Sequence, residues 1–131
     1  MRYYPAFLNL ENRVVVVVGG GAVAEGKMLS LIETGANVVV ISPELTDPLR
    51  TIVNNRQIHH IPRPFQKGDL KGAVLAVAAT DNPDTNREIS QEGESLSIFV
   101  NNATSPESSS YIVPALLTRG DLQIAVSTGG Q

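Results

Sequence analysis

The sequence has no cysteine and no tryptophan, and its aromatic residues are limited to three tyrosines and three phenylalanines among 131 residues. The absence of cysteine excludes disulfide bonds, thiolate nucleophiles and thiolate metal sites. Charge of one sign is not in large excess either, because ten basic and 13 acidic residues give a formal net charge of −3. Such a chain has no general attraction for a phosphate backbone, so nucleic acid is not an expected partner.

Long hydrophobic runs are also missing. The five consecutive valines of residues 14–18 are far too few to cross a bilayer, and the N-terminal residues lack an apolar segment followed by a small-residue cleavage site. Neither membrane insertion nor secretion is therefore predicted, and we expect a cytoplasmic protein. A length of 131 residues allows one domain with a real core.

The most informative segment is an apolar strand that runs into three glycines and then into a helix. Residues 13–18 show no polar alternation, which is typical of a parallel strand buried on both faces. Gly19, Gly21 and Ala24 then match the G-x-G-x-x-G/A fingerprint of dinucleotide sites. Gly19 permits the tight turn, Gly21 lets a pyrophosphate approach the backbone, and Ala24 keeps helix and strand close. The first N–H groups of the helix, at Ala22 and Val23, would face the phosphates.

Strands and helices alternate along most of the chain. Strands are predicted at residues 13–18, 37–42, 58–61, 73–79 and 97–100, and helices at 22–34, at 44–54 with a late start forced by Pro48, and at 83–92. This alternation predicts an α/β fold with a Rossmann-like, doubly wound parallel sheet in the strand order 3-2-1-4-5. Asp81 or Asn82 is a candidate cap for the third helix, whose first turn accepts Pro83.

Both ends of the chain depart from this rhythm. Residues 3–8 are read as an extended arm or edge strand packed on the domain. Residues 111–117 and 122–126 are predicted to be two added strands beyond the nucleotide fold. We therefore divide the chain into a nucleotide-binding domain at 1–105 and a second region at 106–131, which we expect to be truncated because the sequence stops directly after a strand.

The cofactor is predicted from the end of the second strand. The ribose-binding carboxylate usual at this point is replaced by Ser42-Pro43, with Glu44 two positions later. Ser42 could bond a ribose hydroxyl, and no arginine adjoins it along the chain to hold a 2′-phosphate. NAD is therefore favoured over NADP.

Other polar residues have ordinary structural explanations. Thr80-Asp81 and Asn101-Asn102 lie where ligands bind in open α/β sheets, and capping and turn formation explain Asp81 at least equally well. His59-His60 would point to opposite faces of a strand, so no metal site is predicted. Arg63 and Lys67 are interpreted as solvated charges. The serines at 108–110 have no general base nearby in the sequence, so a nucleophilic serine is not expected. Gly26 in the first helix is explained by close packing, close ligand approach or drift.

A set of motifs spread over the whole chain resembles the precorrin-2 dehydrogenases, which occur as the N-terminal module of sirohaem synthases and as separate enzymes, some of them also sirohydrochlorin ferrochelatases. The matching residues are Tyr4-Pro5-x-Phe7-Leu8-x-Leu10, Val17-Val18-Gly19-Gly20-Gly21-x-Val23-Ala24-x-x-Lys27, Gly35-Ala36, Ala78-Ala79-Thr80-Asp81, Asn86, Val100-Asn101, Pro114-Ala115, Arg119-Gly120 and Ile124 to Gly130.

The resemblance implies NAD-dependent oxidation of precorrin-2 to sirohydrochlorin, a tetrapyrrole step toward sirohaem. It places the pyrophosphate at Gly21, Ala22 and Val23, the adenosine ribose at residues 42–44, and the nicotinamide beside Thr80 and Asn101. It also implies a homodimer formed through the tail strands. The cofactor would accept the hydride while the protein orients it.

One residue departs from the family pattern. Members usually carry an aspartate shortly after the fifth strand, proposed as general base and in chelation, and Thr104 holds that position here. Threonine cannot accept a proton at neutral pH as a carboxylate does. Glu107 or Asp81 could substitute, the proton could pass to water, or the chain could be a non-catalytic NAD-binding module. A short-chain or 2-hydroxy-acid dehydrogenase is disfavoured, because no Tyr-x-x-x-Lys pair or well-placed histidine is present.

Overall fold

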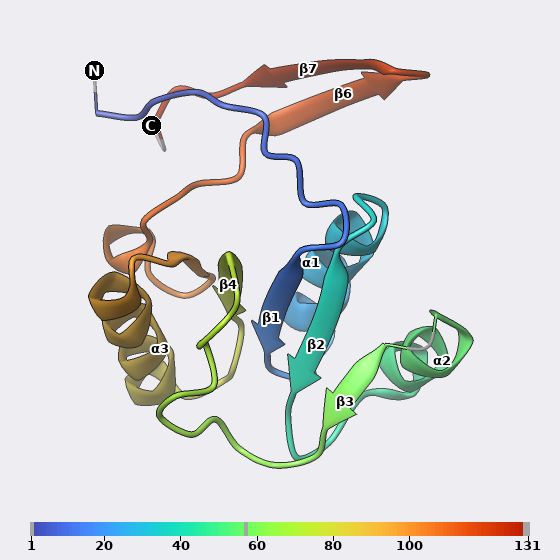
Figure 1. Cartoon of the computed structure of the whole chain (residues 1–131), viewed down its shortest axis with the longest axis vertical. Coiled ribbons are helices and arrows are strands. Elements are labelled where there is room, and N and C mark those ends of the chain that lie inside the picture. The colour runs from blue at the N-terminus through green and yellow to red at the C-terminus, as the bar shows by residue number, and fades with distance from the viewer. Residues whose placement is uncertain (1, 57, 130–131) are drawn as a thin grey trace.

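A parallel five-stranded sheet forms the centre of the computed structural model, which describes residues 2–56 and 58–129 (Figure 1). Its strands are β1 (Val14–Val18), β2 (Asn37–Ile41), β3 (His59–Ile61), β4 (Leu75–Ala78) and β5 (Phe99–Asn102). They lie in the order β3-β2-β1-β4-β5, and every neighbouring pair is parallel. The predicted sheet and its strand order are confirmed.

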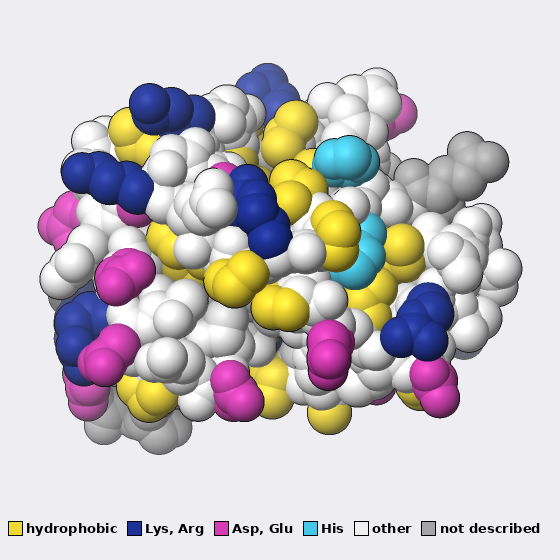
Figure 2. All heavy atoms as spheres, turned by 90° about the horizontal axis from the view of Figure 1, so that it is seen from below, with side chains coloured by type: hydrophobic (Ala, Val, Ile, Leu, Met, Phe, Trp, Pro, Cys, Tyr) yellow, Lys and Arg dark blue, Asp and Glu magenta, His cyan; other side chains and the backbone are white. Residues whose placement is uncertain are grey.

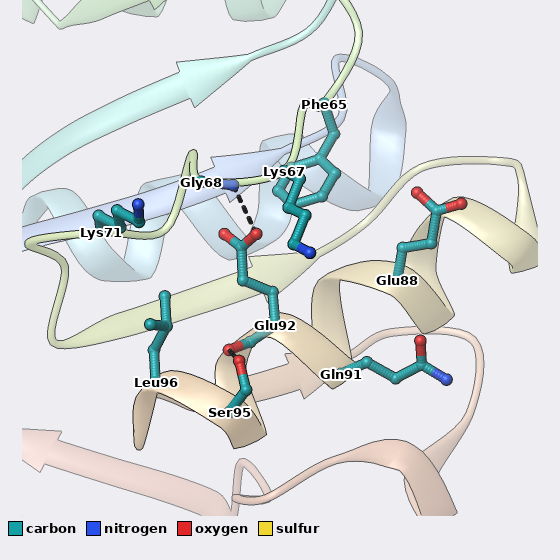
Figure 3. A pocket seen from close by; sticks show the side chains of 9 residues that line it. All are labelled: Phe65, Lys67, Gly68, Lys71, Glu88, Gln91, Glu92, Ser95 and Leu96. Carbon is teal, nitrogen blue, oxygen red and sulfur yellow. Dashed lines mark hydrogen bonds between the residues drawn. The ribbon is translucent and has the colours of Figure 1, made fainter.

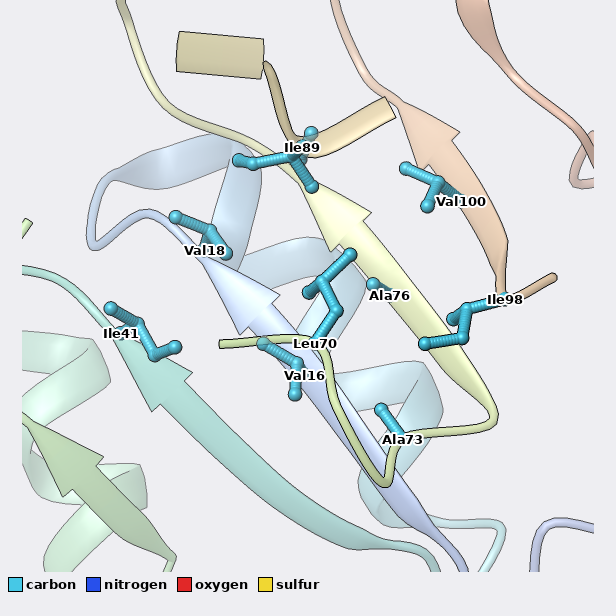
Figure 4. Packing of buried hydrophobic residues seen from close by; sticks show 10 residues of the cluster. Val16, Val18, Ile41, Leu70, Ala73, Ala76, Ile89, Ile98 and Val100 are labelled. Carbon is cyan, nitrogen blue, oxygen red and sulfur yellow. The ribbon is translucent and has the colours of Figure 1, made fainter. Parts of the chain in front are cut away.

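Three helices cover the sheet, and the valine run of β1 supplies side chains to both of its faces. Val17 packs in the cluster that contains residues of α1 (Ala22–Ile32) and α2 (Asp47–Arg56). Val16 and Val18 pack on the opposite face, in the cluster that contains residues of α3 (Pro83–Leu96) and of the crossover at 62–74 (Figure 4). A strand buried on both faces explains why this segment has no polar alternation.

The boundaries of α3 and β5 differ from those predicted. Asn82 caps α3 by accepting hydrogen bonds from the backbone of Asp84 and Thr85, which confirms one of the two candidate caps. The helix continues to Leu96 rather than ending near residue 92. Ser97, with φ of +58°, then reverses the chain, and β5 begins at Phe99, two residues later than predicted.

The outer edge of β5 is covered by serine hydroxyls rather than by another strand. Backbone N–H groups of Val100 and Asn102 each donate a 2.8 Å hydrogen bond, to Ser110 Oγ and Ser109 Oγ respectively. The N–H of Ser110 in turn donates to the Val100 carbonyl. These serines follow a single 3-10 turn, η1 (Pro106–Ser108).

The tail forms two strands, but as a separate sheet, and the first begins at Ala115 and ends at Arg119 rather than spanning residues 111–117. β6 (Ala115–Arg119) and β7 (Leu122–Val126) pair antiparallel with each other and with no strand of the central sheet within the described ranges. The N-terminal arm reaches the end of the tail, where the Tyr3 ring lies next to Gly129. It contains no assigned strand over residues 2–12, so the predicted edge strand is not formed. Tyr4, Phe7 and Leu8 are exposed, so these apolar side chains are not packed on the domain as predicted.

Two details of α1 correct the predicted helix. Val23, expected in the apolar stripe, lies in the first turn of α1 and is 56% exposed. A Cβ built on Gly26 would meet no atom within 4 Å, so close packing does not explain that glycine.

Gly26→Ala is expected to stabilise the protein by about 1 kcal/mol, because alanine restricts the unfolded chain and favours the helix. The free energy of unfolding measured by urea denaturation checks this result. A decrease in the free energy of unfolding would contradict this expectation, because it would mean that the alanine methyl group is not tolerated at this position.

Candidate functional site

The carboxyl ends of the parallel strands meet at one edge of the sheet, where ligands bind in open α/β folds. The strands point downward in Figure 1, so Figure 2 looks directly onto this edge, where basic side chains and both histidines lie beside apolar ones. The residues predicted to bind the cofactor lie in the loops that follow β1, β2 and β4, in the first turn of α1, or near the end of β5.

Two of the three glycines are required by backbone contacts. Gly19 has φ of +129°, and a Cβ there would overlap the backbone carbonyl of Ala79. A Cβ on Gly20 would overlap the carbonyl of Glu44, whose loop is held to the turn by a 2.9 Å bond from the Thr46 N–H to the Gly20 carbonyl. The G-x-G-x-x-G/A fingerprint allows any residue at the position of Gly20. The requirement for glycine there is therefore visible only in the structure.

Gly21 has a different role, because it leaves space open. It is the N-cap of α1, in an extended conformation (φ −101°, ψ −164°), and a Cβ there would meet no atom within 4 Å. No described side chain caps the helix. Ala22 and Val23, both exposed, begin a helix whose first N–H groups lack intrahelical partners, which is the arrangement that binds a phosphate. Ala24 is fully buried against the sheet, as its position in the fingerprint predicts.

In the loop after β2, Ser42 is not placed as predicted, because its hydroxyl is not free to bond a ribose. Ser42 is buried, and its hydroxyl donates a 2.7 Å hydrogen bond to the Glu44 carbonyl, so its proton is already committed to holding the loop. Pro43 and Glu44 are exposed. The Glu44 carboxylate is therefore better suited than the Ser42 hydroxyl to accept hydrogen bonds from a ribose.

A buried asparagine on α3 joins the loops that follow β4 and β5. The side chain of Asn86, which has no exposed surface, accepts from the Thr80 N–H at 3.1 Å and donates to the Thr80 carbonyl at 3.0 Å. Its Nδ2 also donates to Thr104 Oγ1 at 3.2 Å. Thr104 Oγ1 in turn donates to Asn102 Oδ1 at 3.0 Å, so this hydroxyl is used both as an acceptor and as a donor.

Asn101, predicted to line the nicotinamide side, is 8% exposed near the end of β5. Its Nδ2 donates to the carbonyl of Tyr111 at 3.2 Å, while its buried Oδ1 has no partner among the described residues. Burial raises the pKa of the Tyr111 phenol above its ordinary value. An unpartnered buried acceptor is costly in an isolated protein, and it is a suitable partner for a ligand N–H.

The two carboxylates that could replace the family's aspartate lie in different places. Asp81 is exposed and directly follows Thr80, which Asn86 connects to Thr104. Glu107 lies on η1, where it accepts from Ser105 at 3.3 Å and lines a hollow along the outer edge of β5. Of these two carboxylates, Asp81 is therefore the one beside the crevice.

The histidines do not act together. His59 is exposed, whereas His60 Nε2 lies 2.9 Å from the Ser42 carbonyl. Within residues 2–56 and 58–129, no group of three or more His, Asp or Glu side chains is placed to hold a metal ion. No helix in the same ranges is long and apolar enough to span a membrane.

A hollow of about 610 Å³ lies away from this edge, between the crossover at 62–74 and α3 (Figure 3). Lys67 and Lys71 stand at its rim. Both carboxylate oxygens of Glu92 are occupied there, since they accept from the N–H groups of Gly68 at 2.6 Å and Leu70 at 2.9 Å. This region fastens the crossover to α3.

Arg63 is not the solvated charge that the sequence suggests. Its guanidinium makes two hydrogen bonds to the Asp69 carboxylate, of 2.8 and 2.9 Å. These bonds hold the pKa of the Asp69 carboxyl below its usual range and raise the pKa of Arg63. The prediction that no arginine adjoins Ser42 holds only along the chain, because the Ile61 carbonyl accepts from the N–H of both Ser42 and Arg63.

Comparison with known proteins also indicates a nucleotide-binding chain. The family model described as putative NAD(P)-binding matches residues 6–115. The chain is 41% identical over 130 residues to a siroheme synthase of Methylobacillus flagellatus, and 40% identical to one of Thioalkalivibrio sulfidiphilus, with 99% of this chain aligned in each case. It spans only 28% and 27% of their lengths.

A solved structure described as SirC, precorrin-2 dehydrogenase, superimposes with a TM-score of 0.80 at 27% identity, over 98% of this chain and 64% of that one. Because the match extends over nearly the whole chain, the tail sheet is included in the similarity. These similarities confirm the resemblance predicted from the motifs, and the chain belongs to the putative NAD(P)-binding family.

Proposed function

We propose that this chain is the NAD-binding part of an oxidoreductase that converts precorrin-2 to sirohydrochlorin, a step in siroheme biosynthesis. The observation that carries the proposal is the open, uncapped N-terminus of α1 at Gly21. This feature occurs in a chain that resembles siroheme synthases and a precorrin-2 dehydrogenase over nearly its whole length. NAD supplies the hydride acceptor for this chemistry.

The proposed binding residues lie along the sheet edge described above. In the proposal, the N–H groups of Gly21, Ala22 and Val23 hold the pyrophosphate, and Gly19 shapes the turn that presents them. Residues 42–44 flank the adenosine ribose, with the Glu44 carboxylate as the principal acceptor. Thr80 and Asn101 line the nicotinamide side, where the unpartnered Asn101 Oδ1 fits the N–H donors of a carboxamide.

The proton that leaves with the hydride needs an acceptor other than Thr104. Threonine is a poor base, and its hydroxyl is already engaged by Asn86 and Asn102. We propose that Asp81, which follows Thr80 at the crevice, takes this role directly or through water.

Turnover of precorrin-2 by the full-length protein tests the proposal, with NADH formation followed at 340 nm. The expected result is NAD-dependent oxidation that is lowered at least tenfold in kcat by Asp81→Asn, with little change in NAD affinity. Absence of any stabilisation by nicotinamide nucleotides in thermal melts would contradict the cofactor assignment itself.

A non-catalytic NAD-binding module is the second candidate, and the threonine at position 104 favours it. The Thr104→Asp variant separates the two. A wild-type protein that binds NAD but oxidises precorrin-2 only after this substitution supports the module, whereas normal wild-type turnover eliminates it.

We propose that the chain has a nucleotide-binding part and a tail with a separate role in dimerisation. Residues 1–105 bind the nucleotide, and residues 106–131 begin a dimerisation region. The support is the face of the tail sheet that carries Leu117, Leu122, Ile124 and Val126, each between 44% and 63% exposed. An isolated two-stranded sheet is marginally stable in water, and a second copy of the chain would cover this face. We also propose a cytoplasmic location, which cell fractionation tests.

Ile124→Asp is expected to convert a homodimer to monomer, because it places a charge in the middle of the apolar face. Sedimentation of the full-length protein measures the change. Thr118→Glu, on the opposite face of the same sheet, serves as the control and should leave the dimer intact. A wild-type monomer at micromolar concentration would rule out this role of the tail.

A further inference from the structure

The arginine that the fold brings to the end of β2 comes from a neighbouring strand. Ser42 is the first residue after β2 and Arg63 is the second residue after β3. Their N–H groups donate to one oxygen, the Ile61 carbonyl. His60, on the same strand as Ile61, also contacts the Ser42 carbonyl through Nε2. The backbone of Arg63 therefore lies next to the loop that is proposed to hold the adenosine ribose.

Arginine is the side chain that commonly distinguishes NADP from NAD at this point in the fold. The 2′-phosphate of NADP lies near the end of the second strand, and a guanidinium there binds it through paired, charge-assisted hydrogen bonds. Glu44, exposed in the same loop, instead accepts hydrogen bonds from a ribose and repels a phosphate.

The Arg63 guanidinium is held in place by three of its five N–H donors, and the paired face formed by Nη1 and Nη2 is occupied by Asp69. Nη1 donates to Asp69 Oδ2 at 2.8 Å and to the Pro64 carbonyl at 3.0 Å, and Nη2 donates to Asp69 Oδ1 at 2.9 Å. The carboxylate is fixed in turn by the Gln66 N–H at 2.7 Å. The side chain of Asp69 is only 11% exposed, so solvent competes weakly for it.

We infer that Asp69 determines cofactor specificity: by holding the Arg63 guanidinium, it keeps a potential 2′-phosphate ligand away from the ribose site and so favours NAD over NADP. This inference rests on the proposed binding of NAD at the Gly21 turn. It assigns a ligand-selecting role to a pair that touches neither the pyrophosphate loop nor the residues after β4 and β5.

The test is the affinity of the full-length protein for NAD and NADP, measured by isothermal titration calorimetry. Asp69→Asn preserves the size of the side chain and its contact with the Gln66 N–H, but removes the charge that holds Arg63. Affinity for NADP should rise by about tenfold or more, while affinity for NAD changes by less than about twofold. Adding Arg63→Gln to this variant should remove the gain.

A matched control is available on α3, where Asp84 pairs with Arg87 at 3.0 Å on the surface. Asp84→Asn makes the same change in net charge and also frees an arginine, but away from the ribose loop. NADP affinity should stay at the wild-type value. An equal gain in this control would mean that net charge, rather than Arg63, attracts the phosphate.

Three outcomes overturn the inference while leaving the proposed function intact. These are unchanged NADP affinity in a folded Asp69→Asn variant, equal wild-type affinities for NAD and NADP, and loss of NAD binding on Arg63→Gln alone. The last variant tests the inference even if Asp69→Asn does not fold, because a guanidinium held away from the site should be dispensable for NAD. A wild-type protein that binds neither nucleotide contradicts the proposed function instead.

Discussion

Gly21→Asp is expected to abolish NAD binding, raising Kd by at least about 100-fold, in a protein that remains folded. The carboxylate would occupy the open space at the N-terminus of α1 and repel the pyrophosphate at the point where the N–H groups converge. The backbone conformation at Gly21 is extended and suits any residue. Aspartate is also a favourable N-cap, so the free energy of unfolding should stay equal or rise by a few tenths of a kcal/mol, roughly.

The measurement combines calorimetric titration with NAD and thermal unfolding of the same variant. Gly26→Asp is the matched control, since it adds the same charge to the exposed surface of the same helix and should bind NAD nearly as tightly as the wild type. Unchanged NAD affinity in Gly21→Asp would show that the pyrophosphate does not lie at this turn.

Asn86→Leu is expected to lower the free energy of unfolding by about 2–3 kcal/mol, because leucine fits the volume but leaves buried polar partners unbonded. The N–H and carbonyl of Thr80 would lose their bonds to the amide, and so would the Thr104 hydroxyl. The loops after β4 and β5 would then no longer be joined, and NAD affinity should also fall. Urea denaturation measures the stability.

Asn54→Leu is the control for this substitution, because Asn54 is an exposed residue of α2. Its effect should stay within about 0.5 kcal/mol. If Asn86→Leu were as mild as the control, water would be replacing the amide and the three-way connection would contribute little to the fold.

The strands and their order could be predicted because their signals are local. A β-branched run that ends in glycine marks a buried strand and its turn, and alternation with helices leaves few possible topologies. The end of α3 could not be predicted in this way. Its C-terminal half is polar, and the chain reversal depends on Ser97, a non-glycine residue with positive φ.

Two parts of the site that sequence reasoning missed depend on pairs that are distant in the chain. The need for Gly20 follows from the position of the Glu44 carbonyl, and the proximity of Arg63 to Ser42 follows from the pairing of β2 with β3. Glycine and arginine give no sign of these partners by themselves. The proximity of Arg63 to Ser42 could have been inferred from the predicted strand order 3-2-1-4-5, because this order places the residues after β2 and β3 side by side.

The serine hydroxyls along β5 have a consequence for how copies of the chain can associate. A strand at the edge of a sheet is a template for pairing with another chain, and unprotected edges lead to aggregation. Here Ser109 and Ser110 already bond the outward N–H groups of Asn102 and Val100. An incoming strand would have to displace them, so the central sheet resists growth at this side and edge-to-edge polymerisation is disfavoured.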